Sequence, residues 1–132
     1  MNRSITILTA LLAALLFANS CENNNDRVTR AVTETVHSVT PAKILHDASE
    51  LDAKHGASED LSLPLDTLPD SFAAFDPVEV RRQYPGSYFI VTAMWNQHRT
   101  GLRIAAPSEV IPSSTKYVTY EKIAERLYLY QD

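Results

Sequence analysis

The chain has 132 residues, of which 45% are hydrophobic, and it carries 12 Lys and Arg against 16 Asp and Glu. This length suits one domain, and the acidic balance argues against nucleic-acid binding through phosphate contacts. A single cysteine excludes an internal disulfide framework and a multi-cysteine zinc site, and three glycines exclude glycine-rich repeats.

The N-terminal segment has the organisation of an export signal. Arg3 supplies one positive charge, and residues 5–18 follow without a charged side chain. An apolar run of this length is typical of a signal peptide and is short for a helix that spans a bilayer. Small residues then lead into the lone cysteine as Ala18-Asn19-Ser20-Cys21. We therefore assign residues 1–20 to a signal peptide.

The segment Ala18-Asn19-Ser20-Cys21 resembles the lipobox of bacterial lipoproteins. The resemblance implies that Cys21 is acylated, becomes the first residue of the mature chain and holds the protein at the cell envelope. Acylation removes the oxidation risk that a lone exported thiol would carry. Glu22 favours the outer membrane, facing the periplasm, by resemblance to sorting in enteric bacteria. Because Ala18 and Asn19 depart from the usual pattern, ordinary signal-peptidase cleavage, giving a secreted or periplasmic protein, is the alternative.

The mature chain is expected to begin with a tether and two helices. Residues 21–27 are polar and suit a solvated tether, and residues 28–132 form one small domain. Apolar or small residues over 28–39 follow one helical face, so we expect a helix there, although their β-branched character would also suit a continued tether. Thr40-Pro41 is a helix start and Gly56 a helix end, which predicts a second helix over 41–55.

The remaining chain predicts a loop, a short helix and then strands. Residues 57–67 are a loop, and a helical turn or two follows Pro69 and ends at Asp76-Pro77. Beyond Pro77 the hydrophobic period changes to two. We expect strands at 78–81, 88–94, 102–106, 117–120 and 127–130, a helical turn at 123–126, and a type II turn at Tyr84-Pro85-Gly86-Ser87.

This order of elements predicts an α+β domain in which N-terminal helices precede a small antiparallel sheet of three to five strands. The expected core consists of Leu51, Phe72, Phe75, Val78, Val80, Phe89, Val91, Leu102, Ile104, Leu127 and Leu129. Short motifs over half of the chain also resemble a group of small uncharacterised bacterial proteins: Leu68-Pro69, Pro77-Val78, Gly101-Leu102 and a C-terminal Tyr-x-x-Ile followed by Leu127-Tyr128-x-Tyr130. That resemblance carries no activity over.

Two groups of residues are candidates for binding. The polar loop 95–100 joins two apolar strands and places Trp95, His98 and Arg99 together, residue types that often anchor interfaces. The alternative is a plain hairpin loop with Trp95 folded into the core. Tyr128 and Tyr130 share one strand face and form either a contact surface for a partner or glycan or a structural cover.

Other charged residues give weaker indications. His46 and Glu50 share a helix face, but no third ligand is apparent, so we expect a solvent-facing pair and no metal or cofactor. Residues 41–76 are acidic and residues 77–132 mildly basic. This asymmetry suggests either favourable packing between the two halves or an anionic partner near Arg81, Arg82, Arg99 and Arg103.

The sequence offers no catalytic constellation: it has no Gly-x-Ser-x-Gly elbow, no phosphate-binding glycine loop and no spaced acid–base pair. We therefore expect a protein that is not an enzyme. The expected function is a lipid-anchored interaction or accessory module of the cell envelope, in contact with the membrane through its anchor and with an envelope protein partner, without nucleic acid. A small-ligand or polysaccharide-binding lipoprotein is the alternative, and a hydrolase ranks below both.

Overall fold

The computed structural model describes residues 24–56, 60–83 and 85–132. Within these ranges two longer helices, α2 (Asn24–Val39) and α3 (Pro41–His55), precede a 3₁₀ turn, η1 (Leu65–Thr67), and a short helix, α4 (Asp70–Ala73). None of the helices in the described ranges is long and apolar enough to cross a membrane. The signal segment and Cys21 lie outside the described residues.

The strands form one antiparallel sheet in the order β1-β2-β3-β4-β6-β5. The α+β class is confirmed, but the described residues form six strands rather than three to five. The extra strand is β1, which lies in the segment expected to be a loop and is too short to show a period of two. β1 is a strand because Leu61 and Ser62 pair with Arg82 and Arg81 of β2. The strands are β1 (Leu61–Ser62), β2 (Glu79–Gln83), β3 (Ser87–Trp95), β4 (His98–Ile104), β5 (Thr119–Ala124) and β6 (Leu127–Gln131).

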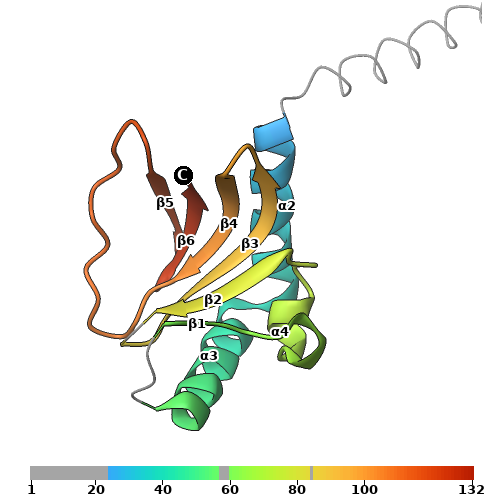
Figure 1. Cartoon of the computed structure of the whole chain (residues 1–132), viewed down its shortest axis with the longest axis vertical. Helices are drawn as coiled ribbons and strands as arrows, with labels where there is room; N and C mark the ends of the chain where they lie inside the picture. The colour runs from blue at the N-terminus through green and yellow to red at the C-terminus, as the bar shows by residue number, and fades with distance from the viewer. Residues whose placement is uncertain (1–23, 57–59, 84) are drawn as a thin grey trace, which may run out of the picture.

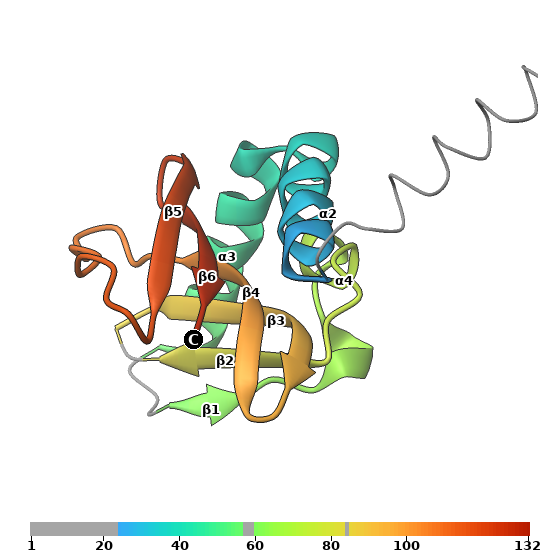
Figure 2. The same ribbon diagram turned by 90° about the horizontal axis from the view of Figure 1, so that it is seen from above.

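The described helices lie on one face of the sheet, and none of them lies on the other, which we call the helix-free side (Figures 1 and 2). α2 crosses β3, β4 and β6, and α3 packs against α2 and α4. Alternation along each strand sends one set of apolar side chains toward the helices. The core between helices and sheet includes Val32, Val36, Ile44, Ala48, Phe72, Val80, Tyr88, Ile90, Leu102, Ile104 and Leu127.

The helix predicted over 28–39 is confirmed, and it starts earlier than expected. α2 begins at Asn24, so most of the expected tether 21–27 is helical. The Thr33 and Thr35 hydroxyls donate to the carbonyls four residues before them, so both polar side chains have hydrogen-bond acceptors within the helix. Val32 and Val36 of its apolar face are buried, although the expected core did not include them.

The second helix has the predicted boundaries. The Thr40 side chain accepts a hydrogen bond from the Lys43 amide, Pro41 occupies the first turn, and Gly56 follows the last turn at φ 59°. The helical turn after Pro69 is also confirmed as α4.

Two expectations about the strand half are wrong. Ile123 and Ala124 belong to β5 rather than to a helical turn. Ala124 pairs with Leu127 of β6, Ile123 lies at the register shift before it, and the chain reverses at Arg126, whose φ is 63°. Val78 is 53% exposed because it precedes β2 and lies outside the alternating register that buries Val80.

Gly101 allows the central strands to approach one another. It pairs with Val91 on one side and Tyr130 on the other, next to a register shift between Val91 and Ala93. A Cβ atom at Gly101 would lie 1.9 Å from the carbonyl oxygen of Ile90. Only a residue without a side chain fits there, since backbone cannot move aside as a flexible side chain can.

Candidate functional site

The turn between β3 and β4 positions two of the predicted site residues. Strand pairing extends to the Trp95–His98 pair, so the expected six-residue loop is a two-residue turn. Asn96 and Gln97, at φ 49° and 69°, form that turn. Positive φ at both central positions is the type I′ pattern that follows the twist of the strands. The turn holds Trp95 and His98 opposite one another at the tip of a rigid hairpin.

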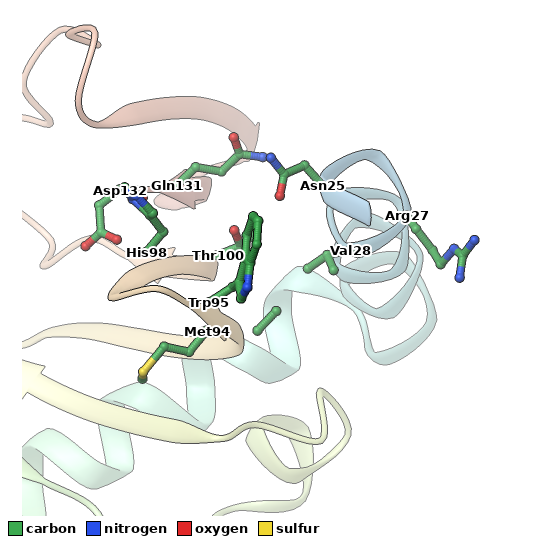
Figure 3. Close-up of a pocket in the computed structure, with 10 residues that line it drawn as sticks. Asn25, Arg27, Val28, Met94, Trp95, His98, Thr100, Gln131 and Asp132 are labelled. Carbon is green, nitrogen blue, oxygen red and sulfur yellow. The ribbon is translucent and has the colours of Figure 1, made fainter. Parts of the chain in front are cut away.

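The hairpin tip borders a pocket of about 510 Å³ that it shares with the start of α2 and the end of β6. Trp95 is 78% exposed, so the alternative in which it folds into the core is wrong. Figure 3 shows the indole standing between Val28 and Thr100, while the side-chain amides of Asn25 and Gln131 face one another across the opening. An aromatic surface flanked by amides suits binding rather than bond cleavage.

His98 and Arg99, neighbours in sequence, separate in the structure. The Nδ1 atom of His98 lies 3.0 Å from the main-chain oxygen of Asp132, beside the pocket. The Arg99 amide donates to the Asp132 carboxylate at 2.6 Å, and its guanidinium donates to Glu79 at 3.3 Å. Arg99 therefore belongs with the helix-free side of the sheet, and the cluster predicted from loop 95–100 is divided between two faces.

The helix-free side carries arginines stacked on aromatic rings. We call Arg81, Phe89, Arg103, Tyr120 and Tyr130 the basic-aromatic face. The Cζ atom of Arg103 lies 4.9 Å from the Phe89 centroid and 5.1 Å from that of Tyr120, and Cζ of Arg81 lies 5.5 Å from Phe89. The Phe89 and Tyr130 rings meet edge to face at 5.0 Å. These distances are within the range of cation–π and aromatic attraction.

The two tyrosines predicted as a contact surface differ in exposure. Tyr130 is only 4% exposed, and its hydroxyl donates to the Asp132 carboxylate. Burial and this hydrogen bond raise the pKa of Tyr130 above its usual range. Tyr130 is therefore a structural member of the basic-aromatic face, whereas Tyr128, two residues earlier on the same strand face, is half-buried and accessible.

Arg103 is held by acceptors on both sides. It donates to the Tyr120 hydroxyl at 2.8 Å and to the Glu109 carboxylate at 2.5 Å. Its Nε is buried and has no hydrogen-bond acceptor among the described residues. Arg81 pairs with Glu79 at 3.3 Å and remains partly exposed.

Arg82 does not belong to the expected basic surface. It lies on the helix side of β2, its side chain is 1% exposed, and it donates to the Asp52 carboxylate at 3.1 Å and to the Gly56 carbonyl at 2.8 Å. The Tyr88 hydroxyl donates to the same Asp52 oxygen at 2.7 Å. Burial and the hydrogen bond to Asp52 raise the pKa of Tyr88. Burial alone would lower the pKa of Arg82, but the bond to Asp52 outweighs it and leaves that pKa raised.

His46, Asp47 and Glu50 bring possible metal ligands within 4.8 Å of one another on α3. His46 pairs with Glu50 at 3.1 Å, as the sequence predicted. The Asp47 oxygens, however, accept from Ser71 at 2.5 Å and from the Lys43 ammonium at 3.1 Å. Burial would raise the pKa of Asp47, yet these bonds keep it below its usual value. A cation at this position would compete with the Lys43 ammonium, so the donor set suits a structural network.

No family model matches the chain, and neither a curated protein nor a solved structure is detectably similar to it. The functional argument therefore rests on the sequence and the geometry of this chain. Sequence reasoning missed the pocket residues Asn25, Gln131 and Asp132, which come from segments far from Trp95. It also missed that Phe89 and Tyr120 complete the basic-aromatic face, although strand alternation with Arg103 and Tyr130 was available as a signal.

Proposed function

We propose that the chain is a lipid-anchored, non-catalytic accessory protein of the cell envelope, acylated at Cys21 and displayed on the periplasmic side of the outer membrane. The observation that carries the proposal is the sequence order of a short apolar run, small residues and the lone cysteine, followed within three positions by the first helix of the domain. A segment with this order is typical of export and lipid attachment.

A protein partner is supported by the basic-aromatic face and its surroundings. Arg81, Arg99 and Tyr128 are partly exposed there, on a side of the sheet that none of the described helices covers. Arginine and tyrosine side chains that lie beside packed aromatic rings are frequent interface anchors. A partner with acidic groups would complement the guanidinium groups of Arg81 and Arg99.

The pocket beside Trp95 favours the second candidate, a small-ligand or polysaccharide-binding lipoprotein. An exposed indole with amides across the opening can stack on a sugar ring and hydrogen-bond its hydroxyls. Since Trp95 is the only tryptophan, its fluorescence reports binding directly. Saturable quenching by soluble envelope glycans would favour this candidate over the protein partner.

The anchor is tested by the intact mass of the protein from membrane and soluble fractions, for the natural chain and for Cys21→Ser. We expect a membrane-bound mature chain that begins at Cys21 and is heavier by its acyl groups, and loss of that form in Cys21→Ser. Ser20→Ala is the matched control, because it changes the same segment and retains the cysteine. An unmodified, freely soluble chain from the natural sequence would contradict the proposal.

The partner is tested by affinity purification after cross-linking in the native envelope. We expect a stoichiometric partner that is retained by the natural chain and lost on Arg99→Ala or Tyr128→Ala. Glu34→Ala is the matched control, since Glu34 is exposed on α2, on the helix side of the sheet. Equal recovery of the partner with all variants would remove this face from the proposal.

A further inference from the structure

The start of α2 lies within three positions of Cys21. A fully extended chain advances at most about 3.6 Å per residue, so Asn24 lies no more than about 11 Å from the anchoring residue. With so short a connection, the end of the domain that bears the start of α2 stays at the membrane surface. Resting on the proposed acylation of Cys21, we propose that this end docks on the phospholipid headgroup layer through Met94, Trp95 and Tyr117.

Large exposed apolar side chains gather at this end. Among the described residues six such side chains are exposed, and the two on the hairpin tip, Met94 at 47% and Trp95 at 78%, border the pocket that the start of α2 also lines. Figure 3 shows them pointing in different directions from neighbouring strand positions, so together they cover both sides of the tip. The apolar surfaces of Met94 and Trp95 make few contacts while they face water, whereas an indole is favoured at a membrane interface.

Strand register brings Tyr117 to the same end. Thr119 pairs with Gln131, and Gln131 pairs with Thr100 near the hairpin tip. Tyr117 lies two residues before Thr119 and is 73% exposed. In Figure 1 the loop that leads into β5 rises at the end where α2 begins. Met94, Trp95 and Tyr117 thus come from two separate segments and lie at the same end of the sheet.

Basic side chains accompany these apolar groups. Lys116 Nζ lies 4.9 Å from the Tyr117 ring centroid, and Arg27 is exposed on the first turns of α2. Long basic side chains can extend to phosphate groups while their stems lie along the apolar layer. Asp26 and Asp132 lie at the same end and offset the charges of Lys116 and Arg27. The proposed membrane contact therefore depends on burial of aromatic and apolar side chains, and added salt should weaken it little.

The short connection favours lipid over a protein as the occupant. A protein partner would have to fit between this end and a bilayer whose lipid is attached about 11 Å or less from Asn24. The basic-aromatic face has no such restriction and stays available to a partner. The two surfaces therefore divide the roles of contact with the membrane and contact with a protein.

Trp95 fluorescence tests the docking directly. The membrane-extracted protein is reconstituted into phosphatidylethanolamine–phosphatidylglycerol vesicles, and Trp95 emission is measured with acrylamide in the water or with brominated acyl chains in the lipid. We expect the emission to shift to shorter wavelength and to be strongly quenched by bromolipid. Quenching by acrylamide should be several-fold weaker than for Trp95 of the Cys21→Ser chain measured in solution without vesicles. High salt should leave these values nearly unchanged.

Two relocated tryptophans provide matched controls. In a Trp95→Phe background, Tyr117→Trp should again be quenched by bromolipid. Val110→Trp should remain open to acrylamide, because Val110 follows Glu109, which lies beside Ser87 at the opposite end of β3, and is itself 87% exposed. Equal bromolipid quenching at positions 95, 110 and 117 would overturn a specific docking end.

The outcomes separate this proposal from the proposed function. If mass spectrometry shows acylated Cys21 while Trp95 stays open to acrylamide and unquenched by bromolipid, the docking is wrong and the anchor stands. If Cys21 is unmodified, the anchor is wrong, and the vesicle titration of the soluble chain then decides the docking alone. Quenching of Trp95 by added bromolipid vesicles would support a lipid-binding end in that case, and no quenching would overturn it.

Discussion

The two faces of the sheet treat neighbouring arginines in opposite ways. Arg82 is buried beneath α3, where Asp52 and the Gly56 carbonyl accept its hydrogen bonds. Arg81, one residue earlier, lies over the Phe89 ring on the helix-free side and remains partly exposed. The comparison teaches that one strand can hold one guanidinium as a structural tie and present the next as a surface group, solely through alternation.

The largest effect should come from breaking the buried tie. Arg82→Met removes the guanidinium that donates to the Asp52 carboxylate and to the Gly56 carbonyl, and we expect a loss of about 3–5 kcal/mol in the free energy of unfolding. Arg81→Met should cost less than about 1 kcal/mol, because its ion pair is partly exposed. Urea denaturation of both variants measures the contrast. Equal losses would mean that the two faces do not differ as described.

Gly101 tests whether the close approach of β3 and β4 is required. A Cβ atom would meet the Ile90 carbonyl oxygen at 1.9 Å, so Gly101→Ala should destabilise the protein by about 3 kcal/mol. Gly56→Ala is the control, since nothing lies within 4 Å of its position and only its φ of 59° is unfavourable. That variant should cost about 1–2 kcal/mol, because a Cβ atom is disfavoured at φ 59° and ψ −132°. A thermal unfolding scan that ranks Gly56→Ala as the worse of the two would contradict the packing argument.

High and low pH should affect the molecule through different groups. Tyr88 and Tyr130 have raised pKa values, so the unfolded chain loses their protons first, and stability should fall as the pH rises above about 10. Asp47 has a lowered pKa, so its contribution is present above about pH 4 and is lost as the pH falls below it.

The alkaline loss can be divided between the two faces. Tyr88→Phe should flatten the part that arises on the helix side, and Tyr130→Phe the part on the helix-free side. Asp47→Asn should flatten the acid limb and leave the alkaline limb unchanged. The free energy of unfolding measured across pH checks this, and an alkaline limb that survives both tyrosine changes would contradict the assignment.

The smallest effect concerns the hairpin tip. Gln97 adopts φ 69° without being glycine, and Gln97→Gly in the type I′ turn should stabilise the protein by about 0.5 kcal/mol. Asn96→Gly is the comparison, and its gain should be smaller because asparagine already tolerates positive φ. A drop in the midpoint of thermal unfolding for Gln97→Gly would indicate a different turn.

Long periodic segments of the fold could be predicted from the sequence, whereas short and long-range features could not. Helical spacing predicted the helix over 28–39, and Thr40-Pro41 with Gly56 predicted both ends of α3. β1 has two residues and exists through its partner strand, so no local pattern reveals it.

The candidate site was predictable only in part. Trp95 and His98 do lie together at the pocket, but Asn96-Gln97 lacks the glycine that usually marks a type I′ turn, so the sequence indicates a longer loop than the hairpin that forms. Arg82 could have been assigned correctly, since it shares a strand face with Val80, which was expected in the core. Pairings that join Asn25 to the end of β6 depend on the tertiary fold and leave no signal in the sequence.

The two edge strands of the sheet, β1 and β5, affect whether neighbouring copies of the protein can pair through their strands. β1 offers only two residues to an incoming strand, and β5 carries a bulge between Lys122 and Ala124 together with two consecutive charged residues, Glu121 and Lys122. Short, irregular and charged borders discourage another chain from extending the sheet. If the proposed lipid anchor holds copies side by side on a membrane, where encounters are frequent, they would therefore remain separate folded units instead of joining into continuous β-structure.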